Sequence, residues 1–236
     1  DEQIQSIAAR LVRRLKEVGA TITIAESCTG GLLASTLTDI AGASEWFNQS
    51  WVCYSYDSKI NELDVERELL ESKGAVNASV AIQMADGARK RSGADLAISI
   101  TGIAGPAAVN SKKPVGLVYV GIASAHWANA ESVQVGGNRH ENKVSFVHFA
   151  LETAINCWDM AKVRIEGEIA QKEQAAAEAA VENAKSEAEK ARRAAEAAAG
   201  APWQDESWQN PGKAVADDNA VEWDESQGLF DYSESE

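Results

Sequence analysis

Ala25-Glu26-Ser27-Cys28-Thr29-Gly30-Gly31 decides the fold of this 236-residue chain, because it joins two kinds of secondary structure. The residues before it, Ala20-Thr21-Ile22-Thr23-Ile24, are rich in β-branched side chains and alternate as in a strand. Leu32-Leu33-Ala34-Ser35-Thr36-Leu37, which follows, favours a helix. The heptapeptide therefore predicts a strand, a tight turn of small residues and a helix N-terminus.

Two interpretations of this turn follow from its residues. Backbone N–H groups and the positive end of a helix dipole point toward whatever binds at a strand-to-helix turn. A hydroxyl placed there can attack a carbonyl carbon while the N–H groups hold the developing oxyanion. The alternative is an ordinary corner that is capped by Ser or Thr. The heptapeptide by itself leaves both interpretations open.

Strand and helix patterns alternate along the first 161 residues. Apolar residues recur at helical spacing from Ile4 to about Val18. The alternation predicts an α/β fold with a mainly parallel sheet covered on both faces. The last two strands lack a helical crossover, so we expect them to form an antiparallel hairpin. Strands are expected at Thr21–Ala25, Ser50–Tyr56, Leu96–Thr101, Gly116–Ala123 and Glu131–Val135, and helices at Gly31–Leu37, Glu66–Lys73 and Ser79–Ser92.

The pattern is helical again from His140, and from Gln171 to Ala199 it is dominated by Ala, Glu, Lys, Gln and Arg. Gly200 and Pro202 then supply stop signals. One helix over residues 141–199 would be about 85–90 Å long at 1.5 Å per residue. Leu and Ile do not occupy sustained heptad positions, which disfavours a tight coiled coil. A solvated helical spacer and a helix packed in a larger assembly both remain possible.

Composition sets limits on location and partners. The chain has no apolar run near 18 residues and no secretory signal, which predicts a cytoplasmic protein without a membrane span. Cys28, Cys53 and Cys157 lack CxxC spacing, which disfavours disulfides and a zinc site, and the three His are too scattered to suggest a metal. The net charge is −14. Most of it lies in residues 201–236, which disfavours nucleic acid as a ligand.

The last 36 residues contain Trp203, Trp208 and Trp223 between acidic residues. Aromatic anchors among charges are typical of short segments that dock on a protein partner, although a disordered solubility tail is the alternative. We therefore predict three parts: a domain over 1–161, an Ala/Glu/Lys-rich helical extension over 162–200 and an acidic tail over 201–236.

Further short motifs follow the heptapeptide in order. They are Thr38-Asp-Ile-Ala-Gly-Ala-Ser-Glu-Trp-Phe47, Tyr54 with Lys59, Gly74-Ala-Val76, Met84-Ala-Asp-Gly87, Thr101-Gly-Ile-Ala-Gly-Pro106, Lys113-Pro-Val-Gly116 and Gly137-Asn-Arg139. In this order and spacing the set resembles the C-terminal domain of the CinA family, the nicotinamide-nucleotide amidohydrolases, over about residues 4–160.

The resemblance implies a three-layer α/β/α sandwich and hydrolysis of the carboxamide of nicotinamide mononucleotide (NMN) to nicotinate mononucleotide and ammonia. It implies no cofactor and no metal. Ser27 matches the family's nucleophile and Lys59 its base, with Tyr54 expected to orient or relay the proton. We expect the substrate to be bound by Thr29, Gly30, Gly31, Thr101, Gly102 and Arg139, with Arg139 on its phosphate, and we expect a homo-oligomer.

Several substrate loops depart from the family pattern, so activity could be weakened or lost. Asn138 stands where Asp is usual, Lys143 where Arg is frequent, and Asn77 where Ser is usual. Ala107-Ala108-Val109 replaces Asp-Gly-Gly, and Tyr56-Asp57 replaces Asn-Glu. The alternative function is a non-catalytic component of a virion or another large particle, attached through the C-terminal helix and tail.

Overall fold

The computed structural model describes residues 2–106 and 113–200. Contacts group the chain into two compact units, Asp1–Ala170 and Gln171–Glu236. Three parts of the sequence discussed above, the Ala107-Ala108-Val109 segment, the tail over 201–236 and its three tryptophans, lie outside the described residues.

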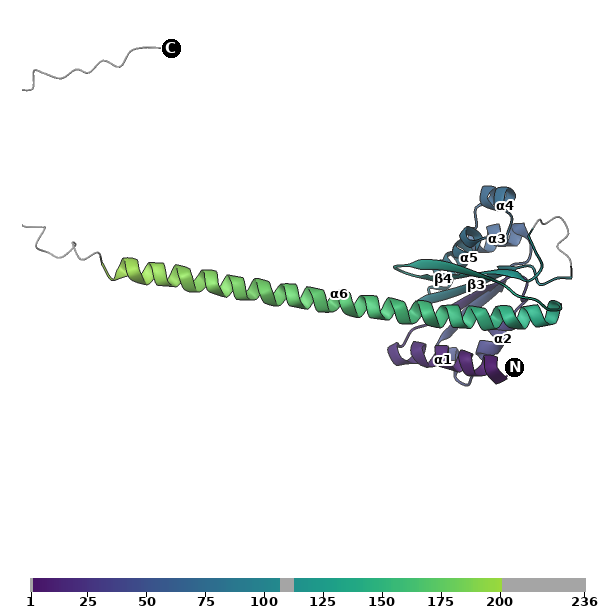
Figure 1. Ribbon diagram of the computed structural model, residues 1–236, viewed down its shortest axis with the longest axis horizontal. Coiled ribbons are helices and arrows are strands. Elements are labelled where there is room, and N and C mark those ends of the chain that lie inside the picture. The colour runs from purple at the N-terminus through teal and green to yellow at the C-terminus, as the bar shows by residue number, and fades with distance from the viewer. Residues whose placement is uncertain (1, 107–112, 201–236) are drawn as a thin grey trace, which may run out of the picture. The chain divides into compact units, whose positions relative to one another are not determined.

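The first unit is built on one sheet with the strand order β2-β1-β3-β4-β5 (Figure 1). Strand β1 pairs in parallel with β2 and β3, whereas β4 is antiparallel to both β3 and β5. Four strands therefore run in one direction and β4 runs against them, and the predicted hairpin of the last two strands is confirmed. The strands are β1 (Ile22–Glu26), β2 (Phe47–Val52), β3 (Leu96–Gly102), β4 (Leu117–Ser124) and β5 (Ala128–Gln134).

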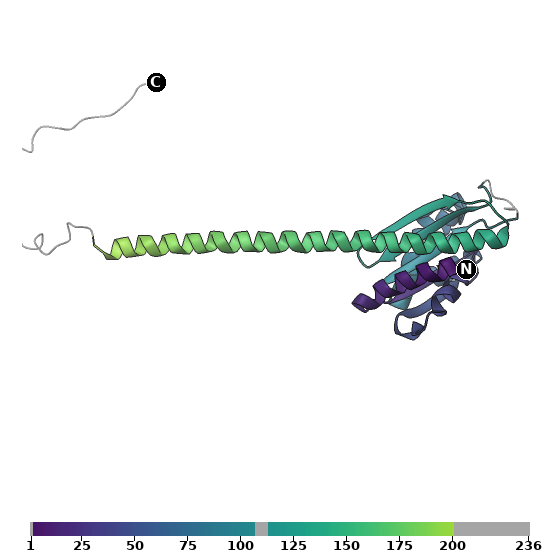
Figure 2. The ribbon, with the colours of Figure 1, turned by 60° about the horizontal axis from the view of Figure 1, so that its bottom comes forward.

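Helices cover both faces of the sheet, which confirms the three-layer sandwich (Figures 1 and 2). One face packs against α1 (Glu2–Val18), α2 (Leu32–Thr38) and the first part of α6 (Arg139–Ala198). The other face packs against α3 (Tyr56–Leu63), α4 (Arg67–Lys73) and α5 (Ala78–Ser92). The long C-terminal helix predicted from the sequence is confirmed as α6.

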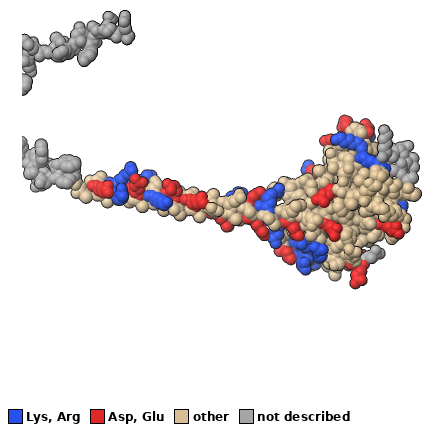
Figure 3. Space-filling view, in the orientation of Figure 1, with Lys and Arg blue, Asp and Glu red and all other residues tan. Residues whose placement is uncertain are grey.

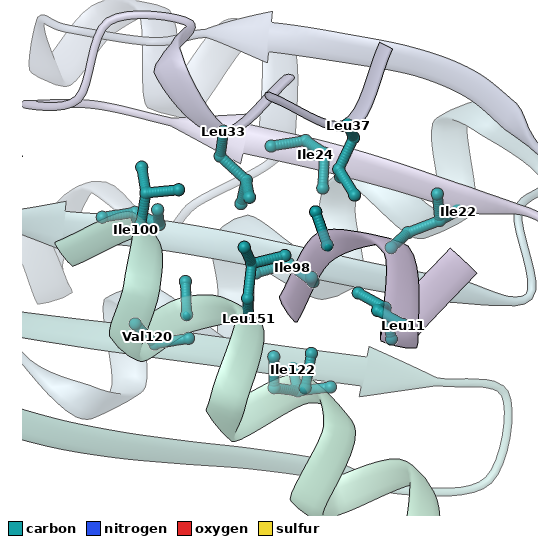
Figure 4. Close-up of a cluster of buried hydrophobic side chains, with 14 of the residues drawn as sticks. Leu11, Ile22, Ile24, Leu33, Leu37, Ile98, Ile100, Val120, Ile122 and Leu151 are labelled. Carbon is teal, nitrogen blue, oxygen red and sulfur yellow. The ribbon is translucent and has the colours of Figure 1, made fainter. Parts of the chain in front are cut away.

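The larger core lies between the sheet and the helices α1, α2 and α6 (Figure 4). Alternate strand residues point into it because successive side chains of a strand face opposite sides. Each buried Leu, Ile or Val side chain contributes about 1.5–3 kcal/mol relative to the exposed state. The residues labelled there are Leu11, Ile22, Ile24, Leu33, Leu37, Ile98, Ile100, Val120, Ile122 and Leu151.

The strand predicted over Ser50–Tyr56 is wrong at its C-terminal end. Strand β2 ends at Val52, and α3 begins at Tyr56. The Ser55 hydroxyl accepts a hydrogen bond from the Ser58 N–H at 3.0 Å, which caps α3. Aromatic residues at 51, 54 and 56 imitate a strand, but this local cap starts a helix instead.

Charged side chains lie close together along the C-terminal part of α6 (Figure 3). Arg192 pairs with Glu196 and Arg193 with Glu189, each one helical turn apart. Within residues 2–106 and 113–200, no helix is both long and apolar enough to cross a membrane.

Candidate active site

The candidate site lies where the parallel strands β1, β2 and β3 end at one edge of the sheet. Ser27 directly follows β1, Tyr54 follows β2, and Thr101 and Gly102 end β3. The chain leaves β1 through α2 on one face and leaves β2 through α3 on the other, so the connections diverge at this edge. Such a switch point is the usual place for a ligand in an open α/β sheet.

Ser27 and Lys59 are in direct contact although 32 residues separate them. The Lys59 Nζ lies 3.3 Å from the Ser27 Oγ, 2.7 Å from the Cys53 carbonyl oxygen and 3.2 Å from the Tyr54 carbonyl oxygen. Lys59 is fully buried, and Ser27 is 8% exposed. No carboxylate is paired with Lys59 among the described residues.

Burial lowers the pKa of Lys59 from 10.5 to about 8, because a low-dielectric environment disfavours the ammonium. A neutral amine has two N–H groups and one lone pair. If its N–H groups donate to the Cys53 and Tyr54 carbonyls, the lone pair faces the Ser27 hydroxyl. This geometry suits a general base that acts on a serine proton.

Some backbone N–H groups of the turn between β1 and α2 already donate hydrogen bonds within the protein. The Gly30 N–H donates to the Ser27 carbonyl at 3.1 Å, and the Gly31 N–H donates to the Glu26 carboxylate at 3.0 Å. Gly30 and Gly31 both have positive φ, at 65° and 97°, where glycine is favoured. Both N–H groups therefore already have acceptors, although the sequence predicted that Gly30 and Gly31 bind the substrate. Within the described residues, the N–H groups of Cys28 and Thr29 donate to no oxygen acceptor, although the Cys28 N–H lies beside the sulfur of its own side chain.

Of three other predicted site residues, Thr101 and Gly102 are explained by local packing and hydrogen bonding, whereas Thr29 is not. The Thr101 hydroxyl donates to the Ala75 carbonyl at 2.9 Å, and Thr101 is 1% exposed. A Cβ at Gly102 would lie 2.8 Å from the Leu117 carbonyl oxygen, so the β3–β4 pairing itself requires glycine there. The Thr29 hydroxyl is buried without a hydrogen-bond partner among the described residues. Of these three, only Thr29 has a polar group that is not engaged.

Tyr54 and Arg139 form a pair at the rim of the site. The Arg139 Nη2 donates to the Tyr54 hydroxyl at 2.8 Å, and its Nη1 donates to the Gly105 carbonyl. Tyr54 is 60% exposed and reaches Lys59 only through its backbone carbonyl. The structure therefore brings the phenol to Arg139 and not to the Ser27–Lys59 contact. Both acceptors of Arg139 are neutral, so its charge is not compensated by a carboxylate among the described residues.

Lys143 borders the candidate site, although the sequence pointed to it only as a departure from the family pattern. A Cβ built on Gly30 would lie 3.8 Å from the Lys143 Nζ, so this half-buried amine borders the Ser27 turn. Lys143 follows Arg139 by one turn in the N-terminal part of α6. Like charges at this spacing repel, and cations at a helix N-terminus oppose its dipole. That unfavourable pattern was the available sequence signal for an anion site.

Two of the departures from the family pattern retain a capping role. The Asn138 Oδ1 accepts the His140 and Glu141 N–H groups at 2.9 and 3.1 Å, at the start of α6. The Asn77 Oδ1 accepts the Val80 N–H at 3.0 Å, at the start of α5. Asn, Asp and Ser are all good N-caps. These substitutions therefore leave both helix starts in place.

The thiols near the site are poorly suited to act as nucleophiles. Burial raises the pKa of Cys28 to about 11 and also raises the pKa of Cys53. A thiol that stays protonated at neutral pH is a weak nucleophile. In the part of the chain that the structure describes, no three His, Cys, Asp or Glu side chains are grouped as metal ligands.

Comparison with known proteins finds a family and several relatives that this chain resembles. A family model described as the CinA C-terminal domain matches residues 4–158. A CinA-like protein from Geotalea uraniireducens is 44% identical over 151 residues, which are 64% of this chain and 35% of that protein. The chain spans about a third of the length of the curated relatives it matches.

Two solved structures are also similar. The competence/damage inducible protein CihA from Agrobacterium tumefaciens has a TM-score of 0.63 and 38% identity, over 65% of this chain and 94% of that one. A CinA superfamily protein from Klebsiella pneumoniae has a TM-score of 0.65 and 29% identity, over 66% of this chain and 98% of that one. The family match over residues 4–158 lies within the first unit.

Proposed function

This chain belongs to the CinA C-terminal domain family, and from that premise we propose that it hydrolyses the carboxamide of NMN. The products are nicotinate mononucleotide and ammonia. The observation that carries this proposal is the contact of the Ser27 hydroxyl with a buried lysine at 3.3 Å. Amide hydrolysis of this type needs a nucleophile, a base and donors for an oxyanion. The Ser27 turn offers the nucleophile and the donors, and Lys59 of α3 offers the base.

In the first half of the reaction, the Ser27 Oγ attacks the carboxamide carbon and its proton passes to the Lys59 Nζ. The carbonyl oxygen becomes an oxyanion. We assign its stabilisation to the N–H groups of Cys28 and Thr29, because the other donors of the turn already have acceptors. When the intermediate collapses, the carbon–nitrogen bond breaks and Lys59 returns the proton to the departing ammonia. The acyl group remains as an ester on Ser27.

In the second half, a water molecule attacks the ester carbonyl. Lys59 accepts a proton from the water, and the same N–H groups hold the second oxyanion. Collapse breaks the bond to Ser27, whose oxygen takes the proton back from Lys59. Nicotinate mononucleotide then leaves as the carboxylate, and the proton that its new carboxylic acid loses passes to the released ammonia to give ammonium. The cycle consumes one water and needs no change in the oxidation state of any atom.

We assign the substrate's phosphate to Arg139 and Lys143. Both are cations at the start of α6, neither is paired with a carboxylate among the described residues, and Lys143 borders Gly30 of the Ser27 turn. A phosphate between them would relieve their mutual repulsion. Its negative charge would also offset the unfavourable interaction of the two cations with the positive end of the helix dipole.

The experiment that tests the proposal compares wild type with Ser27→Ala. Purified protein is incubated with NMN, and both ammonia and nicotinate mononucleotide are quantified. Wild type should release the two products in equal amounts. Ser27→Ala should lose several orders of magnitude in rate while keeping the wild-type melting temperature. Equal rates in the two proteins would contradict a serine nucleophile, and a wild type without turnover would contradict the assignment of substrate.

The described residues give no observation that favours the alternative function as a structural component of a particle. The proposed docking of the acidic tail on a protein partner concerns residues 201–236, which lie outside them. Both stay predictions from the sequence.

A further inference from the structure

Glu26 is a buried carboxylate that the proposed mechanism does not use. It is the last residue of β1, where it pairs with Val52 of β2 on one side and Ile100 of β3 on the other. It is 0% exposed. A carboxylate in such a place is costly unless hydrogen bonds compensate for the lost water.

Its compensation comes from the start of α2. The Glu26 Oε2 accepts the N–H groups of Gly31 at 3.0 Å and Leu33 at 3.2 Å, and its Oε1 accepts the Ala34 N–H at 2.8 Å. The N-cap residue Gly31 has no side chain to do this. A helix N-terminus has unpaired N–H groups and a positive dipole end, so an acceptor with a negative charge suits it well.

This side chain therefore ties the residue before Ser27 to the first turn of the helix that follows it. The turn between them is held from inside as well, because the Ser27 N–H donates to the Ile100 carbonyl at 3.0 Å and the Gly30 N–H to the Ser27 carbonyl. With Gly31 engaged by Glu26, the N–H groups in residues 27–31 that donate to no oxygen among the described residues are those of Cys28 and Thr29.

We propose that Glu26 is a positioning residue that holds the Ser27 turn, so that the N–H groups of Cys28 and Thr29 stay directed to the reacting carbonyl. This inference rests on the proposed function. Glu26 touches neither the substrate nor the reacting atoms. It acts by occupying the α2 donors, which would otherwise compete for the carboxamide oxygen, and by fixing the backbone of the turn. Its loss should therefore harm the transition state more than substrate binding.

Two variants separate geometry from charge, and a third is the control. Glu26→Gln keeps the length but sets an NH2 group against the α2 N–H donors. Glu26→Asp keeps the charge but is one methylene shorter, while β1 holds its backbone in place. Glu141→Gln is the matched control, since the Glu141 Oε2 also accepts a backbone N–H near a helix start, from Asn138 at 2.8 Å, but at α6. Circular dichroism melts establish that each variant is folded.

The first readout is steady-state kinetics with NMN. Both Glu26 variants should lower kcat about 100-fold, which is the loss seen when an oxyanion donor is removed. KM should stay within about threefold of wild type, because the phosphate contacts are unchanged. Glu141→Gln should keep the wild-type kcat. A Glu26 variant that raises KM and keeps kcat would overturn the proposal, and so would a folded Glu26→Asp with wild-type kcat. If Glu26→Gln does not fold, Glu26→Asp decides the question.

The second readout does not depend on NMN. A fluorophosphonate labels an activated serine through a tetrahedral phosphorus centre that uses the same oxyanion donors. Labelling of Ser27, followed by mass spectrometry, should be at least about tenfold slower in both Glu26 variants than in wild type and Glu141→Gln. Equal labelling rates in folded proteins would overturn the role of Glu26. Labelling that slows as expected in a protein that never turns over NMN would sustain that role and reject only the proposed substrate.

Discussion

The Lys59 amine lies 3.3 Å from the Ser27 hydroxyl. It is held there by the backbone carbonyls of Cys53 and Tyr54, which directly follow β2. Because those carbonyls are fixed, the amine stays beside Ser27 in either protonation state. Its charge state then depends on burial, which lowers its pKa to about 8. The buried Lys59 amine therefore predicts how activity and stability change with pH.

Activity should rise with pH as Lys59 loses its proton. At pH 7 only about a tenth of the molecules would carry the neutral base, and at pH 9 about nine tenths. We expect kcat/KM for NMN to increase through a midpoint near 8 and then to level off. Lys59→Met should lower kcat by about 10²–10⁴-fold and remove this rise. A flat profile for wild type between pH 6 and 9 would contradict the role of Lys59 as the base.

Stability should also depend on pH because of Lys59. The folded-state pKa of about 8 lies below the ordinary value of 10.5, so between these values the unfolded chain holds a proton that the folded chain has lost. Wild type should therefore gain stability relative to Lys59→Met as pH rises from 8 to 10.5. Below pH 8 the folded protein carries the full cost of a buried ammonium at Lys59. The full gain corresponds to about 3 kcal/mol. Urea unfolding of both proteins at pH 7.5 and pH 10.5 measures it, and a constant difference would refute the buried-ammonium interpretation.

Arg139 and Lys143 should determine selectivity for a phosphorylated substrate. Arg139→Ala and Lys143→Met should each raise KM for NMN about 10–100-fold with a small effect on kcat, as expected for loss of a charge-assisted hydrogen bond. Nicotinamide riboside, which lacks the phosphate, should be affected little by either change. Lys162→Met, an exposed lysine on the same helix, is the control and should behave as wild type. An equal loss on both substrates would show that the two cations do not bind the phosphate.

Tyr54→Phe distinguishes two roles for the tyrosine. Its hydroxyl accepts from Arg139 at 2.8 Å, whereas only its carbonyl contacts Lys59. If the hydroxyl orients Arg139, the variant should raise KM for NMN about 3–10-fold and leave kcat nearly unchanged. A kcat reduced 100-fold with unchanged KM would instead favour the proton relay expected from the sequence.

Gly87 should be required for the packing that supports Lys59. A Cβ at Gly87 would lie 1.9 Å from the Leu63 carbonyl oxygen, so α5 and α3 pack backbone to backbone at this point. Gly87→Ala must push α3 away, which should cost about 1–3 kcal/mol of stability and displace Lys59, one turn earlier on α3. Gly93→Ala is the control. Its φ is +70°, so the substitution strains the backbone, but nothing lies within 4 Å of the added Cβ and no helix has to move. Thermal melts and kcat of both variants provide the test, and an unchanged kcat in a destabilised Gly87→Ala would limit the role of Gly87 to stability.

The sequence by itself determined the elements whose signals are local. Alternation in residues 20–24 and the small residues after it were enough to predict β1, the turn and α2. The run of helix-forming residues that ends before Gly200 was enough to predict α6. The same locality explains the error at Ser50–Tyr56, where aromatic residues and a serine cap gave opposite signals and the cap prevailed.

Tertiary structure alone decided which groups of the site are available. Ser27 meets Lys59 across 32 residues, and Tyr54 meets Arg139 across 85. The lowered pKa of Lys59 arises from burial under elements that are distant in sequence. Glu26 accepts the N–H group of Gly31, which the sequence predicted at the substrate, together with those of Leu33 and Ala34. Only the packing of α2 on β1 brings its carboxylate to them. Periodicity and caps depend on neighbouring residues, whereas desolvation and long-range hydrogen bonds exist only after the chain has folded.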